Sequence, residues 1–266
     1  GFLLGATAGR TTLNGEGLQH EDGHSHLLSA TIPNCISYDP CFGYELAVII
    51  QNGLERMIKN QEDVFYYITI MNENYHHPEI PKNVNEGIIK GIYKYSENKT
   101  KGPKVQLMGS GVILREVIEA ASILEKEFNV SSTVFSVTSF TEVRRNALDI
   151  QRWNMLNPDK TEKKSTLDEI IIDLESPIIT ATDYMKSFAE QIATFLPNKF
   201  ISLGTDGFGR SDSREALRDF FEVDRHHIVI AALKALNEKQ EIEKSVLLSA
   251  LKKYKIMNDK PNPVSL

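Results

Sequence analysis

Hydrophobic positions in the first third of the chain follow a strand, helix, strand pattern. Asn34–Tyr38 forms a short apolar run that predicts a strand, and Tyr44–Met57 has apolar residues at helical spacing. Val64–Met71 is a continuous run of β-branched and aromatic residues, which is typical of a strand buried on both faces. Two strands joined by a helix predict a parallel sheet. Residues 1–26 show no clear period, so we expect mainly loop there.

The same α/β rhythm recurs more regularly after residue 100, with a boundary before it. The stretch His76–Asn83 has two prolines and no period, so we place a domain boundary there and expect domains at 1–81 and 82–266. The second is predicted to be a doubly wound α/β domain. Its expected strands are Val105–Met108, Thr133–Val137, Ile178–Ala181 and Phe200–Leu203, and its expected helices are Val112–Phe128, a helix opened by a capping box from Ser139 to Glu142, Tyr184–Phe195, and Asp224–Tyr254 with a break near Asn237–Glu241.

Composition and charge narrow the functional classes. The chain has 266 residues, 41% of them hydrophobic and 25% charged, which is typical of a soluble globular protein. The net charge of −6 lies entirely in residues 1–85, which argues against binding to nucleic acid or to a membrane surface. Two cysteines, Cys35 and Cys41, are too few for a disulfide framework and are expected as free thiols. The chain opens without methionine on sequence typical of an interior segment, so we expect a fragment or a processed product.

The densest candidate chemistry is a glycine-rich loop within Asn14–His26. Its titratable residues are Glu16, His20, Glu21, Asp22, His24 and His26. Glycines let such side chains converge, and histidine titrates near neutral pH. Three interpretations fit: acid–base chemistry on an anionic substrate, a transition-metal site using His20, His24 and His26, and a polar surface loop without chemistry.

Three weaker candidates follow predicted strands. Asn72–His77 leaves a buried strand at the edge where open α/β sheets bind ligands, but we favour a polar strand exit that leads into the linker. Gly109–Gly111 lacks the third glycine of a dinucleotide fingerprint, so we interpret it as a tight turn. Thr205–Asp212 precedes a helix expected to be capped by Asp212, and its aspartates would repel an anion, which favours a structural loop.

Several long motifs, in order along the chain, resemble one family. They are Gly9–His26, Ile32–Pro40, Asn72–His76, Ser136–Glu142, Arg152–Met155, Thr182–Met185 and Gly204–Glu215. The sequence is similar through these to the homodimeric bacterial pyruvate dehydrogenases (acetyl-transferring). The resemblance implies an α/β fold of the transketolase type, with 1–81 the last part of the middle, pyrimidine-binding domain and 82–266 the C-terminal domain.

The resemblance also implies an activity. Members use thiamine diphosphate and Mg²⁺ to decarboxylate pyruvate, and they transfer the acetyl unit to lipoyl groups of the dihydrolipoyl acetyltransferase core. The resemblance implies a homodimer in the cytoplasm. It implies that His20 is the active-site histidine and Glu16 its companion, with no catalytic role for His24 or His26.

Two cofactor-binding features of the family are missing from this chain, which limits the activity expected of it. The family's Gly-Asp-Gly…Asn motif for magnesium and diphosphate has no counterpart here, and the glutamate that activates the cofactor is expected upstream. We therefore expect no cofactor-binding residue and no metal ligand in this chain, and no decarboxylation by the chain alone. Two alternatives stay open: a metal-dependent hydrolase using His20, His24 and His26, and a non-catalytic dimerisation module.

Overall fold

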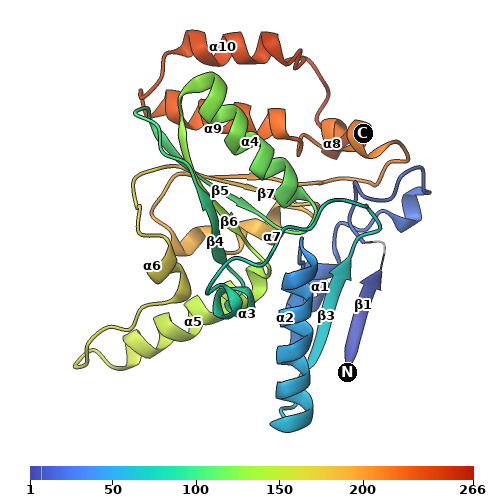
Figure 1. The fold of residues 1–266 in the computed structure, drawn as a ribbon, viewed down its shortest axis with the longest axis vertical. Helices are drawn as coiled ribbons and strands as arrows, with labels where there is room; N and C mark the ends of the chain where they lie inside the picture. The colour runs from blue at the N-terminus through green and yellow to red at the C-terminus, as the bar shows by residue number, and fades with distance from the viewer. Residues whose placement is uncertain (7) are drawn as a thin grey trace.

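The first residues build a small parallel sheet in the computed structural model, which describes residues 1–6 and 8–266 (Figure 1). Its strand order is β1 (Phe2–Ala6), β3 (Phe65–Ile70), β2 (Cys35–Tyr38), and both pairings are parallel. Helices α1 (Ser25–Ala30) and α2 (Gly43–Leu54) accompany it, and α2 runs on into one π-helical turn, η2 (Glu55–Lys59). We call this sheet with its helices the N-terminal unit.

A second sheet of five strands forms the centre of what we call the C-terminal unit. Its strand order is β4-β6-β5-β7-β8, and only β4 runs antiparallel to its neighbour. The strands are β4 (Tyr93–Glu97), β5 (Lys104–Gly109), β6 (Ser131–Ser136), β7 (Ile178–Ala181) and β8 (Phe200–Leu203). Neighbouring side chains on β5 enter different cores: Leu107 packs in one cluster and Met108 in the other.

Helices cover both faces of this sheet, which confirms the doubly wound fold (Figure 1). On one face lie α4 (Ile113–Phe128) and α9 (Arg225–Glu238), with α10 (Lys244–Lys253) packed on α9. The other face is covered by α5 (Phe140–Leu156), α6 (Thr166–Ile170) and α7 (Lys186–Glu190). The remaining elements are α3 (Asn85–Lys90), α8 (Arg214–Phe220) and the short 3₁₀ turns η1 (Leu18–His20), η3 (Ala193–Phe195) and η4 (Pro263–Ser265).

Most predicted elements are confirmed, and the differences have local causes. Strands β1 and β4 were not predicted, because both are short edge strands without a buried run. The helix expected over Tyr184–Phe195 is wrong in extent, since α7 ends at Glu190 and only a 3₁₀ turn follows. Ser213, rather than Asp212, caps α8 by accepting the N–H of Ala216.

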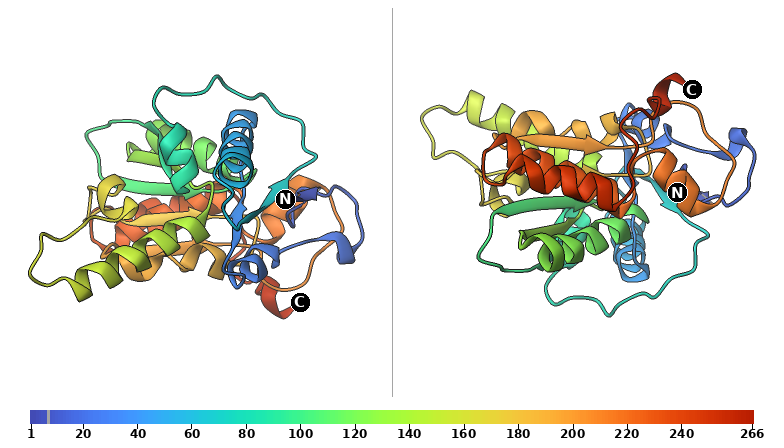
Figure 2. Two further views of the ribbon diagram at one scale, coloured as in Figure 1. Left: turned by 90° about the horizontal axis from the view of Figure 1, so that it is seen from below. Right: turned by 90° about the horizontal axis from the view of Figure 1, so that it is seen from above.

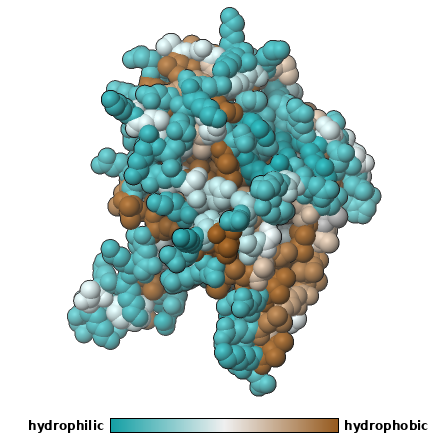
Figure 3. Space-filling model, viewed as in Figure 1, coloured by the Kyte–Doolittle hydropathy of each residue, from teal (hydrophilic) through white to brown (hydrophobic). Residues whose placement is uncertain are grey.

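Two surface features bear on what the chain contacts. Hydrophobic surface gathers around β1, where Leu3 and Leu4 are exposed, and extends over that end of the molecule (Figure 3). In the described part of the chain, no helix is both long and apolar enough to cross a membrane. Cys35 and Cys41 are free thiols, as predicted, and both are buried.

Candidate functional site

The structure brings the two predicted site residues together at the surface. His20 ends the 3₁₀ turn η1, and its Nδ1 lies 3.4 Å from Oε2 of Glu16. Their side chains are 61% and 53% exposed. An imidazole can both donate and accept a proton, and a ring this exposed can reach a ligand. The pair therefore has the geometry of an accessible acid–base group.

Arg10 holds the loop that carries His20 against the C-terminal unit. The Arg10 side chain is buried, its Nε donates to the carbonyl of Glu21 at 3.2 Å, and its Nη1 donates to the carbonyls of Thr205 and Gly207. The views in Figure 2 show the N-terminal loop and the segment before α8 side by side. One side chain thus joins the main chain next to His20 to a loop almost 200 residues later in the sequence.

Asp183 holds the beginning of the same loop. Its carboxylate accepts the backbone N–H of Thr11 at 3.1 Å, and burial raises the pKa of Asp183 to about 6. Gly9 has a φ of +91°, and a Cβ there would lie 2.1 Å from Oδ2 of Asp183. Only glycine fits this approach.

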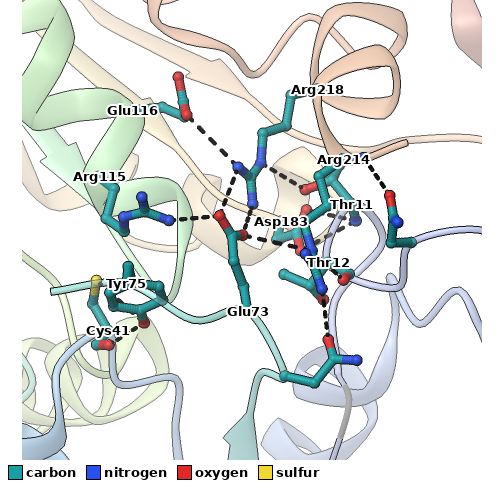
Figure 4. Close-up of polar contacts among 12 residues, drawn as sticks. Thr11, Thr12, Cys41, Glu73, Tyr75, Arg115, Glu116, Asp183, Arg214 and Arg218 are labelled. Carbon is teal, nitrogen blue, oxygen red and sulfur yellow. Dashed lines mark hydrogen bonds and ion pairs between the residues drawn. The ribbon is translucent and has the colours of Figure 1, made fainter. Parts of the chain in front are cut away.

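Glu73 is the hub of a second contact between the two units (Figure 4). Its carboxylate accepts hydrogen bonds from Arg218 on α8 and, at 2.6 Å, from Arg115 on α4. Burial opposes ionisation, but hydrogen bonds from Arg218 and Arg115 outweigh it and hold the pKa of Glu73 below its usual value. Asn72–His77, weighed above as a ligand site, therefore makes structural contacts; His77, for example, accepts the N–H of Gly43.

The loop histidines do not converge on a metal. His26 is fully buried, stacks on Phe188 with ring centroids 4.7 Å apart, and shares a 2.9 Å hydrogen bond with Thr69. Burial lowers the pKa of His26 to about 3. His24 instead lies with Nδ1 at 3.3 Å from Nη2 of Arg10. The hydrolase alternative is therefore not favoured.

One group with metal-ligand spacing occurs in the part of the chain that the structure describes, and it lies elsewhere. It consists of Asp219, Asp224 and His227. Asp224 already caps α9, because its carboxylate accepts the backbone N–H of His227 at 2.8 Å and contacts the same ring. Two of its three members, Asp224 and His227, are thus already paired with each other at the start of α9.

Comparisons with known proteins place two parts of the chain in known domain families. Residues 91–224, half of the chain, match the Transketolase-like TK C-terminal domain. The chain belongs to the transketolase-like family. Residues 1–78 match the Pyruvate dehydrogenase E1 component middle domain. Transketolase from Campylobacter jejuni superposes with a TM-score of 0.64 at 16% identity, covering 88% of this chain and 31% of that one, which confirms the fold class.

Two relatives match essentially the whole chain. The pyruvate dehydrogenase E1 component of Cupriavidus necator is 54% identical over 100% of the chain, and that of Pseudomonas aeruginosa is 57% identical over 99%. The resemblance of the sequence to bacterial pyruvate dehydrogenases is confirmed. The chain spans about 30% of the length of these relatives.

Sequence reasoning missed Arg10 and the burial of Glu21. One signal was available, because Arg10 is the only lysine or arginine before Arg56, and an isolated cation in an acidic segment indicates a specific partner. Glu21 is only 5% exposed, and neither carboxylate oxygen has a partner among the described residues. Burial raises the pKa of Glu21 to about 8.

Proposed function

We propose that this chain is part of a thiamine-diphosphate-dependent pyruvate dehydrogenase E1 component. That enzyme would decarboxylate pyruvate, the product of glycolysis, and transfer the acetyl unit to lipoyl groups of a dihydrolipoyl acetyltransferase. The observation that carries the proposal is the identity of 57% along essentially the whole chain to such a component. We also propose that the enzyme is a cytoplasmic homodimer, with residues 1–81 in the middle domain and 82–266 as the C-terminal domain.

His20 is proposed as the catalytic residue of this chain, with Glu16 beside it. The exposed ring and its carboxylate neighbour at 3.4 Å support hydrogen bonding and proton transfer at the carbonyl or carboxylate of pyruvate. We assign no sequence of chemical steps to this chain alone, because His20 acts on a substrate that polypeptide outside this chain would hold.

The described residues do not fit the magnesium and diphosphate end of the cofactor. In their single group with metal-ligand spacing, Asp224 and His227 are already paired with each other at the start of α9. We therefore assign thiamine diphosphate and Mg²⁺ to polypeptide outside this chain, which spans about 30% of its relatives. No chemical step through the cofactor is assigned to the residues of this chain.

The test compares the chain alone with the enzyme that contains it. We expect the purified 266-residue chain to leave pyruvate unchanged in the presence of thiamine diphosphate and Mg²⁺, while the enzyme containing it releases CO₂. His20→Ala in the whole enzyme should lower kcat/KM by about 100-fold or more, as expected for loss of general acid–base catalysis. Turnover by the isolated chain, or full activity of the alanine variant, would contradict the proposal.

A further inference from the structure

The last residues of the chain are attached to the C-terminal unit. Lys260 donates to the carbonyl of Asp219 at 2.6 Å, and its ammonium lies 5.8 Å from the centre of the Phe220 ring. These contacts place the end of the chain beside α8 (Figure 1). The turn η4 follows, and the side chain of Asn262 opens it by accepting the N–H of Val264 at 3.1 Å. The end of the chain therefore has a defined place on the C-terminal unit.

This end of the chain touches the loop that Arg10 binds. We call residues 261–266 the C-terminal turn and residues 205–209 the Arg10-binding loop. Pro263 is buried, and a Cβ on Gly207 would lie 2.8 Å from its carbonyl oxygen. Gly207 also has a φ of +96°, so only glycine fits this approach of the two main chains. The C-terminal turn and the Arg10-binding loop are therefore in direct contact.

The other end of the Arg10-binding loop packs on the turn that carries His20. A Cβ on Gly209 would overlap the Cβ of Glu21 and lie 3.0 Å from the carbonyl oxygen of Leu18. Leu18 begins the turn η1, which His20 ends, and the N–H of Glu21 donates to the Leu18 carbonyl at 3.2 Å. The Arg10-binding loop therefore lies between the C-terminal turn and η1.

Arg10 joins these contacts through a single side chain. Its Nη1 donates to the carbonyl of Gly207, and its Nε donates to the carbonyl of Glu21 at 3.2 Å. Its guanidinium carbon lies 5.9 Å from the ring centre of Phe221, which lines a cleft of about 250 Å³ together with Pro263. A displacement of Gly207 would therefore move an acceptor of Arg10, and Arg10 holds the main chain next to His20.

We propose that the C-terminal turn is a positioning element for His20, with Pro263 as its buried contact. The turn supports Gly207 from the side opposite η1, so that Arg10 keeps its acceptor and the Arg10-binding loop keeps its contact with η1. Pro263 acts through Gly207 and Arg10, and it is therefore a positioning residue rather than a catalytic one. This inference rests on the catalytic role proposed above for His20.

The first test follows amide exchange in the whole enzyme by mass spectrometry. The variant lacks residues 261–266 and keeps the Lys260 contact. The amides of Glu21 and Asp22 donate within the loop, to the carbonyls of Leu18 and His20. We expect these two amides to exchange about tenfold faster in the shortened enzyme, because local opening becomes easier when a packing contact is lost, while the amides of β5 keep their rates. Unchanged exchange at Glu21 and Asp22 would overturn the proposal.

Two proline variants test the contact without shortening the chain. Pro263→Gly removes the buried ring, and Pro261→Gly makes the same change at an exposed position two residues earlier. Both changes free the unfolded backbone to a similar extent, so Pro261→Gly is the matched control. We expect faster exchange at Glu21 and Asp22 only in Pro263→Gly. Equal exchange in the two variants would overturn the role assigned to Pro263.

Activity measurements separate this positioning role from the function proposed for His20. In the whole enzyme, Pro263→Gly should lower kcat for pyruvate oxidation about tenfold and leave KM for pyruvate nearly unchanged, as expected when a group that acts in the transition state is misplaced. Combined with His20→Ala, it should cause no further loss, because it acts through His20. An equal loss in both backgrounds would overturn the proposal. Full activity of His20→Ala would overturn the function proposed for His20, while amide exchange at Glu21 and Asp22 would still decide whether the C-terminal turn holds the loop.

Discussion

Ser110 donates a hydrogen bond of 2.9 Å to the carboxylate of Asp39, across the boundary between the two units. Ser110 follows β5, at the point where the strand order of the C-terminal sheet reverses and where doubly wound domains commonly bind ligands. Asp39 fills that position, because a Cβ on Gly111 would lie 2.5 Å from its Oδ2. In this chain the reversal point serves contact between the units.

Asp39 makes stability depend on pH. Burial raises the pKa of Asp39 to about 7, although Thr69 and Ser110 donate to the carboxylate and oppose this shift. The folded state therefore keeps a proton that the unfolded state has lost between about pH 4 and 7, so Asp39 makes the free energy of unfolding fall as pH rises through that range. The contribution is about 1.4 kcal/mol per pH unit at most.

The variant Asp39→Asn should remove this contribution. We expect urea unfolding at pH 5 and pH 7 to show a smaller loss of stability with rising pH in the variant than in the parent chain. Asparagine keeps the shape and can still pair with both hydroxyls. An unchanged difference between the two pH values would show that Asp39 is ionised in the folded state at pH 5.

His26, which shares the Thr69 hydroxyl with Asp39, gives the free energy of unfolding a pH dependence of the opposite sign. Thr69 donates its proton to Asp39 at 2.7 Å, so its oxygen accepts from Nε2 of His26 and the ring is neutral. Burial lowers the pKa of His26 to about 3. The unfolded state binds the extra proton below about pH 6.5, so this residue makes stability fall as pH falls from there towards 3.

We expect the ring resonances of His26 to stay constant from pH 7.5 to 4.5 in an NMR titration. His26→Gln should weaken the loss of stability on acidification by up to about 1.4 kcal/mol per pH unit. Zinc added at equimolar concentration should leave the resonances of His26 unchanged, because its ring is sealed by Phe188 and Tyr184. A titration midpoint above pH 5, or a zinc-induced shift, would contradict the buried neutral ring.

Glu73 should be among the most sensitive carboxylates of the chain. Its replacement by glutamine leaves Arg218 buried beside a neutral group, which typically costs about 3–5 kcal/mol when a buried pair is broken. Glu119→Gln is a suitable control, since Glu119 is exposed and lies 4.0 Å from Arg225, and such pairs contribute about 0–1 kcal/mol. If Glu73→Gln and Glu119→Gln lowered the free energy of unfolding equally, the ion pairs of Glu73 with Arg218 and Arg115 would add little stability.

The elements of this fold could be predicted where local pattern decides them, and the site contacts could not. Strands β7 and β8 lie at the predicted positions, because each is a short apolar run between clear turn signals. The resemblance to a family made His20 and Glu16 companions, and the structure places their side chains 3.4 Å apart. By contrast, Arg10 meets Thr205, and Glu73 meets Arg218, through tertiary packing between distant segments, which carries no periodic signal.

The glycine at position 9 provides the sharpest test of how the His20 loop is held. Gly9 and Gly15 both have positive φ, +91° and +76°, so alanine at either position costs about 1 kcal/mol of backbone strain. Nothing lies within 4 Å of a Cβ on Gly15, whereas a Cβ on Gly9 meets Asp183 at 2.1 Å. Gly15→Ala is therefore the matched control for Gly9→Ala.

We expect Gly9→Ala to lower the free energy of unfolding by about 2–4 kcal/mol, with the excess over Gly15→Ala reflecting displacement of Asp183 from the Thr11 N–H. The displacement should also reach the catalytic loop, because Arg10 follows directly and holds the main chain at Glu21. Amide exchange at Glu21 and Asp22 should accordingly speed up in Gly9→Ala and stay unchanged in Gly15→Ala. Equal exchange in the two variants would mean that Arg10 positions the His20 loop independently of Asp183.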